Sequence, residues 1–131
     1  MLCVSSDISK IGSLSITPSS SGNVLIMISG TISGVTSTTV NNGINLKISY
    51  GTGAAPPANG ALAGTQVGGV VTWTNPTAIA SAADLNVPFS ISYVVTGLSL
   101  GTTYWIDLAA EPITTASAMQ LTTVAVVAFE Q

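Results

Sequence analysis

The chain has 131 residues, and only 5% of them are charged, against roughly a quarter in a typical globular domain. Charge normally keeps soluble copies apart, so we expect much of this surface to be covered by further copies or by partners. The net charge of −3 includes no basic cluster, which excludes nucleic-acid binding through phosphate neutralisation. The absence of His excludes a Ser-His-Asp triad and a His-ligated metal site.

Strand-forming residues dominate the first half of the chain, and Gly, Pro, Asn and Ser separate them. The strands predicted there are 14–16, 23–32, one that begins after Gly43, and 67–74. Asn42 and Gly43 form the preferred pair for a two-residue type I′ hairpin, because both tolerate positive φ. Residues 51–64, rich in Gly, Ala and Pro, are predicted to form a long connection that crosses an end of the fold or touches a neighbour.

The second half continues the alternation of apolar and polar residues. The strands predicted there are 88–95, 102–110 and 121–129, with at most one helical turn at 78–83. The burial of the final strand cannot depend on anything downstream, so we expect it to lie inside a sheet. About seven or eight strands in a single domain, residues 14–131, predict an all-β fold, an antiparallel two-sheet β-sandwich of jelly-roll type. An immunoglobulin-like sandwich is the alternative, although its Cys and Trp spacing is missing.

Two segments, 24–28 and 124–129, are apolar without alternation. The first is the longest run of large apolar residues, far shorter than the about 20 residues that a membrane span needs. Each segment is either a strand covered by a second sheet and a loop, or a strand that contacts another subunit. The scarcity of charge favours the subunit contact. The predicted interface residues are Val24, Ile26, Ile28, Tyr104, Val124, Val126 and Phe129.

Side chains that carry chemistry are few and scattered. Asp107 and Glu111 are conceivable calcium ligands, but a hydrogen-bonded carboxylate at the end of a strand and a solvated charge are the favoured reading of the two. Trp73 and Trp105 are candidate ligand-facing aromatics for stacking on sugar rings, although packing in a core or interface is favoured because both lie within predicted strands. We therefore predict no catalytic residue, no metal and no cofactor.

Several segments together resemble small virion proteins of tailed bacteriophages, of the kind that decorate capsids or form head-fibre and tail-fibre tips. These segments are ITPSSSGNVLI at 16–26, ISYGTG at 48–53, PPANG at 56–60, VPFS at 87–90, TGLSLGTTYWIDL at 96–108 and VAVVAFE at 124–130. The resemblance covers about residues 14–131. It implies a jelly-roll similar to that of tumour necrosis factor, assembled as a homotrimer. Residues 1–13 lie outside it and are expected to attach the domain to a capsid or stalk.

The function predicted from these observations is structural and non-enzymatic. The resemblance implies a trimeric capsid decoration protein or fibre knob, assembled in the host cytoplasm and displayed on the particle surface. Its partners would be further copies of itself and the major capsid protein or a fibre or tail protein. The alternative is a receptor-binding or carbohydrate-binding module at a tail-fibre tip that recognises a host-surface glycan. That alternative requires Trp73 or Trp105 to be accessible to solvent.

Overall fold

The computed structural model describes residues 14–33, 40–41, 43–57, 60–75, 86–113 and 120–131. These residues contain seven strands and no helix. The strands are β1 (Leu14–Ile16), β2 (Val24–Ser33), β3 (Gly43–Thr52), β4 (Thr65–Thr74), β5 (Val87–Val95), β6 (Tyr104–Pro112) and β7 (Gln120–Glu130). The predicted attachment segment at 1–13 and the predicted helical turn at 78–83 lie outside the described residues.

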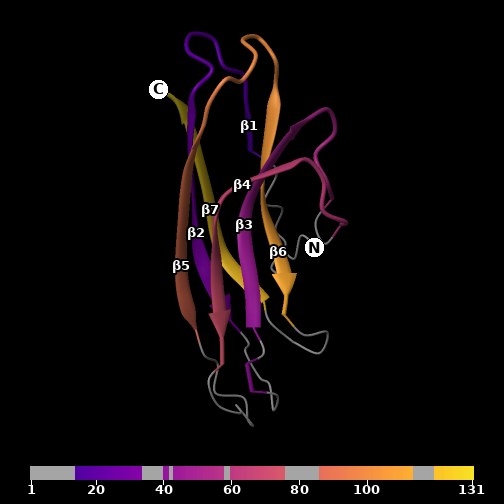
Figure 1. The fold of residues 1–131 in the computed structure, drawn as a ribbon, viewed down its shortest axis with the longest axis vertical. Coiled ribbons are helices and arrows are strands. Elements are labelled where there is room, and N and C mark those ends of the chain that lie inside the picture. Colours follow the sequence, from indigo (N-terminus) through magenta and orange to yellow (C-terminus); the bar gives the residue numbers. More distant parts are fainter. Residues whose placement is uncertain (1–13, 34–39, 42, 58–59, 76–85, 114–119) are drawn as a thin grey trace.

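The strands form two antiparallel sheets that pack face to face (Figure 1). One sheet has four strands in the order β1-β6-β3-β4, and the other has three in the order β5-β2-β7. Among the described strands, only β3 and β4 are consecutive in the chain and paired with each other. The predicted all-β, antiparallel sandwich is therefore confirmed, and most of its strand pairs join distant parts of the sequence.

Two details of the predicted topology are wrong. The expected hairpin around Asn42 and Gly43 does not join β2 to β3, because these strands lie in different sheets. Gly43 instead begins β3 and pairs with Thr74, so closely that a Cβ at Gly43 would collide with the Trp73 carbonyl oxygen. The last strand, β7, lies at the edge of its sheet, and the central position belongs to β2.

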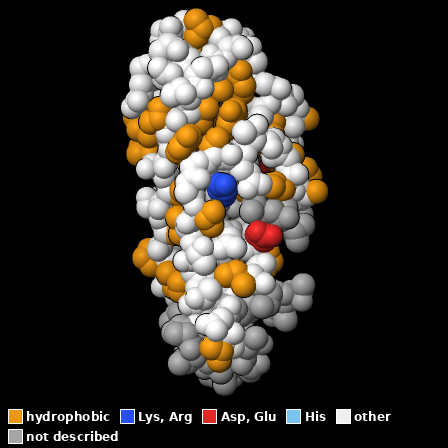
Figure 2. All heavy atoms as spheres, viewed as in Figure 1, with side chains coloured by type: hydrophobic (Ala, Val, Ile, Leu, Met, Phe, Trp, Pro, Cys, Tyr) orange, Lys and Arg blue, Asp and Glu red, His pale blue; other side chains and the backbone are white. Residues whose placement is uncertain are grey.

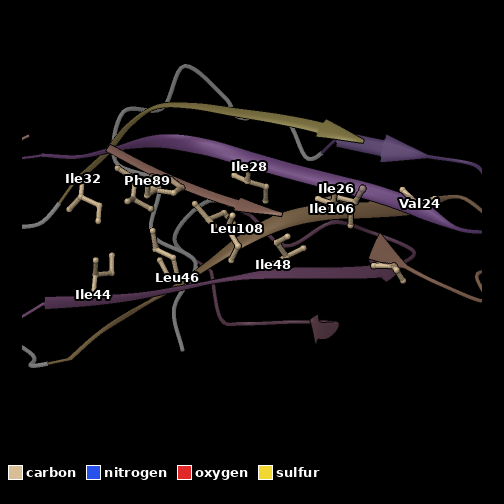
Figure 3. Close-up of a cluster of buried hydrophobic side chains, with 14 residues drawn as sticks. Val24, Ile26, Ile28, Ile32, Ile44, Leu46, Ile48, Phe89, Ile106 and Leu108 are labelled. Carbon is tan, nitrogen blue, oxygen red and sulfur yellow. The ribbon is translucent and has the colours of Figure 1, made fainter. Parts of the chain in front are cut away.

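The hydrophobic core lies between the two sheets and receives alternate residues from their strands (Figure 3). It comprises Val24, Ile26, Ile28, Ile32, Ile44, Leu46, Ile48, Phe89, Ile91, Val95, Ile106, Leu108, Ala110 and Leu121. Each fully buried Val, Leu or Ile stabilises the fold by about 1.5–3 kcal/mol relative to an exposed one. Apart from Phe89, the described core is aliphatic.

Tyr93 is the exception among the inward-facing residues of β5. It pairs with the core residue Ile26 across the sheet but remains 42% exposed. Its ring lies over Gly68 of β4, where a Cβ would sit only 3.2 Å from the Tyr93 Cβ. Gly68 also has a φ of 80°, a conformation that glycine adopts without strain. This contact joins the two sheets along one side of the sandwich.

Candidate functional site

The outer face of the β5-β2-β7 sheet carries a group of large apolar side chains. We call this group the apolar face; it consists of Leu25, Met27, Val94, Val127 and Phe129. The strand register places Leu25 between Val94 and Phe129, and Met27 beside Val127. Four of these side chains remain between 36% and 47% exposed, and Leu25 is half-buried. These residues alternate with the core residues of the same strands, which is why they point outward.

Further along the same outer face the side chains are small. Ser29 of β2 lies between Ser90 of β5 and Ala125 of β7, and Ser92 stands opposite Met27. The large apolar residues are therefore concentrated at one end of the sheet, the end at which β7 finishes and β2 begins.

This outer face carries none of the charged side chains that the structure describes. Lys47, Asp107 and Glu111 all lie on the outer face of the four-stranded sheet, because each is flanked by residues that point into the core. Lys47 stands opposite Ala109 and therefore diagonal to both carboxylates. Figure 2 looks onto that face and shows basic and acidic side chains over β3 and β6. The fourth described charge belongs to Glu130. This residue stands opposite the core residue Val24 in the strand register and therefore does not lie on the outer face.

The outer face of the four-stranded sheet is also better covered by its own chain. Ser49 and Ala109 lie on this face and are nevertheless almost completely buried. The Thr72 hydroxyl donates a hydrogen bond of 2.8 Å to the Asn45 side-chain oxygen across the strand pair β3-β4. The two outer faces of the sandwich therefore differ in both charge and cover.

The two tryptophans do not form a common platform. Trp105 points outward from the four-stranded sheet but is only 5% exposed, because its ring packs against Gly51 and Gly64. Its indole N–H donates a hydrogen bond of 3.3 Å to the Thr52 carbonyl oxygen. Trp73 pairs with the core residue Ile44 and packs half-buried against the core on the opposite face of the same sheet.

Three of the predicted interface residues belong to the core of the single chain. Val24, Ile26 and Ile28 are at most 1% exposed, because the four-stranded sheet covers them. Their side chains therefore have no surface left for a contact with another copy. Within one chain only one face of β2 is buried. The residues of the segment 24–28 that point outward are Leu25 and Met27.

The remaining predicted interface residues are partly accessible. Val124 and Val126 of β7 are half-buried against the core. Tyr104 is half-buried beside Tyr50, with ring centroids 6.1 Å apart, and its hydroxyl accepts a hydrogen bond from the Ser99 N–H. Phe129, at 44% exposed, is the predicted residue that lies on the apolar face. Whether any of them contacts another copy stays a prediction.

The carboxylate of Glu130 occupies a cradle of backbone N–H groups that the sequence did not reveal. Ser19 donates its N–H to Oε2 at 2.8 Å, and Ser20, Ser21 and Gly22 donate theirs to Oε1 at 2.7–2.9 Å. The Ser19 hydroxyl adds a further bond of 3.2 Å to Oε2. These donors favour the ionised carboxylate and hold the pKa of Glu130 well below its usual range.

The cradle is fixed in shape by contacts on both of its sides. The Gly101 N–H donates to the Pro18 carbonyl oxygen at 2.8 Å, and the Leu98 N–H donates to the Gly22 carbonyl oxygen at 2.9 Å. Gly22 has a φ of 69°, and a side chain on Gly22 would collide with the carbonyl oxygen of Leu98. The cradle therefore ties the turn before β2 to the end of β7. The one visible signal was the Ser-Ser-Ser-Gly run, whose consecutive N–H groups are free to donate.

Asp107 and Glu111, which the sequence offers only as conceivable calcium ligands, belong to no described group of three acidic side chains. Asp107 accepts a hydrogen bond of 2.8 Å from the N–H of its neighbour Leu108. Within the described part of the chain, no three His, Cys, Asp or Glu side chains come together in a group that could hold a metal ion. A search of the same residues for a helix long and apolar enough to cross a membrane found none.

Comparison of this chain with protein families, with curated proteins and with solved structures finds no match. The apolar face and the Glu130 cradle are therefore interpreted from their own geometry and chemistry.

Proposed function

We propose that this protein is a non-enzymatic structural component of a bacteriophage virion, either a homotrimeric capsid decoration protein or a fibre knob. The observation that carries the proposal is the apolar face, which exposes four large apolar side chains on a sheet face without a described charge. Exposed apolar patches of this kind mark sites of protein contact. A chain with so few charges gains little protection against association from the rest of its surface.

The virion assignment comes from the resemblance of residues 14–131 to small phage virion proteins. A compact β-sandwich with a covered core suits a building block that is exposed on a particle. Many Ser and Thr residues supply its polar surface in place of charge, and hydrogen bonds of this kind are indifferent to salt. Attachment of the domain to the capsid or to a fibre protein is the role we assign to residues 1–13.

The alternative, a carbohydrate-binding module, requires Trp73 or Trp105 to be accessible to solvent, and neither ring is freely exposed. Trp105 is buried, and Trp73 packs against the core. No feature of the described residues favours this alternative over the structural role.

Two measurements test the proposal. Light scattering of the purified chain at micromolar concentration should give a mass close to three chains. Immunogold labelling with an antibody against the chain should decorate phage particles purified on a density gradient. A monomer would contradict the homotrimer, and unlabelled particles from which the chain is missing by mass spectrometry would contradict the virion role.

A further inference from the structure

We propose that the apolar face is the surface through which copies of this chain contact one another. This inference rests on the self-association that the proposed function includes. It adds which surface of the chain makes the contact. The occupant of the face is a second copy of the chain. The contact centres on the end of the β5-β2-β7 sheet that carries Leu25, Met27, Val94, Val127 and Phe129.

The first argument is the lack of charge on this face. In a trimer around a three-fold axis, the parts of the patch that lie near the axis meet their counterparts from the other two copies. Charged residues in such a patch would repel their counterparts and would lose hydration. The described residues that the strand register places on this face include Leu, Met, Val, Phe, Ser, Thr, Ala and Pro, and none of these carries a charge. Convergence of three such faces on the axis therefore carries no penalty from like charges.

The second argument is that the neighbouring charge is withdrawn from the face. Glu130 is the only charged residue in β7, and it directly follows Phe129. Its side chain points to the opposite side of the strand from Phe129, where the N–H groups of residues 19–22 bind the carboxylate. The cradle thus keeps a negative charge next to the apolar face from entering a contact made there.

The third argument comes from the other outer face, which is a poor site for the same contact. A contact through this face would bring Lys47, Asp107 and Glu111 close to their own counterparts or would remove water from these side chains. Its large aromatic residue, Trp105, is already covered by its own chain. On this face, β4 exposes the apolar side chain of Val70. No other large apolar residue of β4 is similarly exposed.

The test compares two matched substitutions, Val127→Asp and Val70→Asp. Both positions hold valine in an edge strand, and the two side chains are 47% and 52% exposed. We expect Val127→Asp to weaken self-association by at least about tenfold in dissociation constant, as measured by light scattering over a concentration series. Val70→Asp should leave the mass unchanged. Circular dichroism and thermal melting check that both variants fold.

A milder variant keeps the test informative if Val127→Asp does not fold. Val127→Thr preserves the β-branched shape and the strand propensity, and it removes only apolar surface. It should raise the dissociation constant by a few-fold, again with Val70→Thr as its control.

The outcomes separate this inference from the proposed function. A wild-type trimer that dissociates only when position 127 is changed supports the inference. If the folded Val127→Asp variant stays trimeric, or if both Asp variants dissociate equally, the inference is wrong while the trimer stands. A monomeric wild type overturns the inference and the trimer together, whereas labelling of particles still tests the virion role.

Discussion

The two outer faces of this sandwich are built from similar strands but differ in the charged residues that they carry. The face of the four-stranded sheet carries Lys47, Asp107 and Glu111 and packs Trp105 against its own backbone. The face of the three-stranded sheet exposes apolar residues and carries no charge among the residues described. The four charged residues that the structure describes are thus placed unevenly. This difference is what we expect if the three-stranded face is the proposed contact surface.

The largest expected effect distinguishes the inner from the outer side of β2. Ile28→Ala should lower the free energy of unfolding by about 2–5 kcal/mol, because it leaves a cavity in the core. The adjacent Met27→Ala should cost less than about 1 kcal/mol in the isolated chain, because its side chain lies outside the core. Urea denaturation at a concentration where the protein is monomeric measures both. Equal losses in the free energy of unfolding would contradict the placement of Ile28 in the core and of Met27 outside it.

A smaller effect is expected where the four-stranded face is covered by Trp105. Gly51→Val places a side chain where a Cβ would lie 2.5 Å from the Trp105 ring. We expect a loss of about 1–3 kcal/mol in stability, because the ring must shift. Gly69→Val in β4 is the control, since a Cβ there meets no atom within 4 Å. The maximum of tryptophan emission should shift to longer wavelength, as expected for a more solvent-exposed ring, only in the first variant.

The Glu130 cradle predicts an acid-dependent loss of stability. The pKa of Glu130 is lower in the folded chain than its ordinary value of 4.5, so its contribution is fully present above that pH and declines as the pH falls below it. Glu130→Gln should reduce stability at neutral pH and flatten the dependence of melting temperature on pH below 4.5. Glu111→Gln controls for the loss of one negative charge. A melting curve for Glu130→Gln that follows the wild type at every pH would contradict this role.

The smallest expected effect is that of salt. Melting of the wild-type chain should change little between low and high ionic strength, because few charges are present to be screened. The Val127→Asp variant should differ, since salt would screen the like charges brought together and partly restore association. Thermal melting and light scattering at two salt concentrations measure these responses. A strong salt dependence of the wild-type melt would contradict this picture of the surface.

The sequence predicted the strands well because alternation along each strand is a local signal. Leu46, Ile48, Phe89 and Ile91 alternate with polar residues at the period of a strand and do form the core. The pairing of strands depends instead on distant segments, which explains why β7 was expected inside a sheet and is found at its edge. No local pattern could show that Glu130 meets residues 19–22, more than a hundred positions away.

The candidate site was found only in part from the sequence. Low charge and the apolar segments pointed to a contact surface, and Phe129 lies on the apolar face. The runs 24–28 and 124–129 did not show which of their residues point outward, because both alternating sets are apolar. Leu25, Met27 and Val127 were missed for this reason, while Val24 and Ile26 were selected although they lie in the core.

The order of strands in the two sheets has a consequence for how the chain reaches its native state. Among the described strands, only β3 and β4 can pair soon after both have been synthesised, whereas β2 waits for β5 and then for β7. Such non-local topologies fold slowly, because long loops must close before their contacts form. During that interval the apolar side chains of β2 are also accessible to other unfinished chains. The time between the synthesis of β2 and that of β7 is therefore an interval in which aggregation competes with folding.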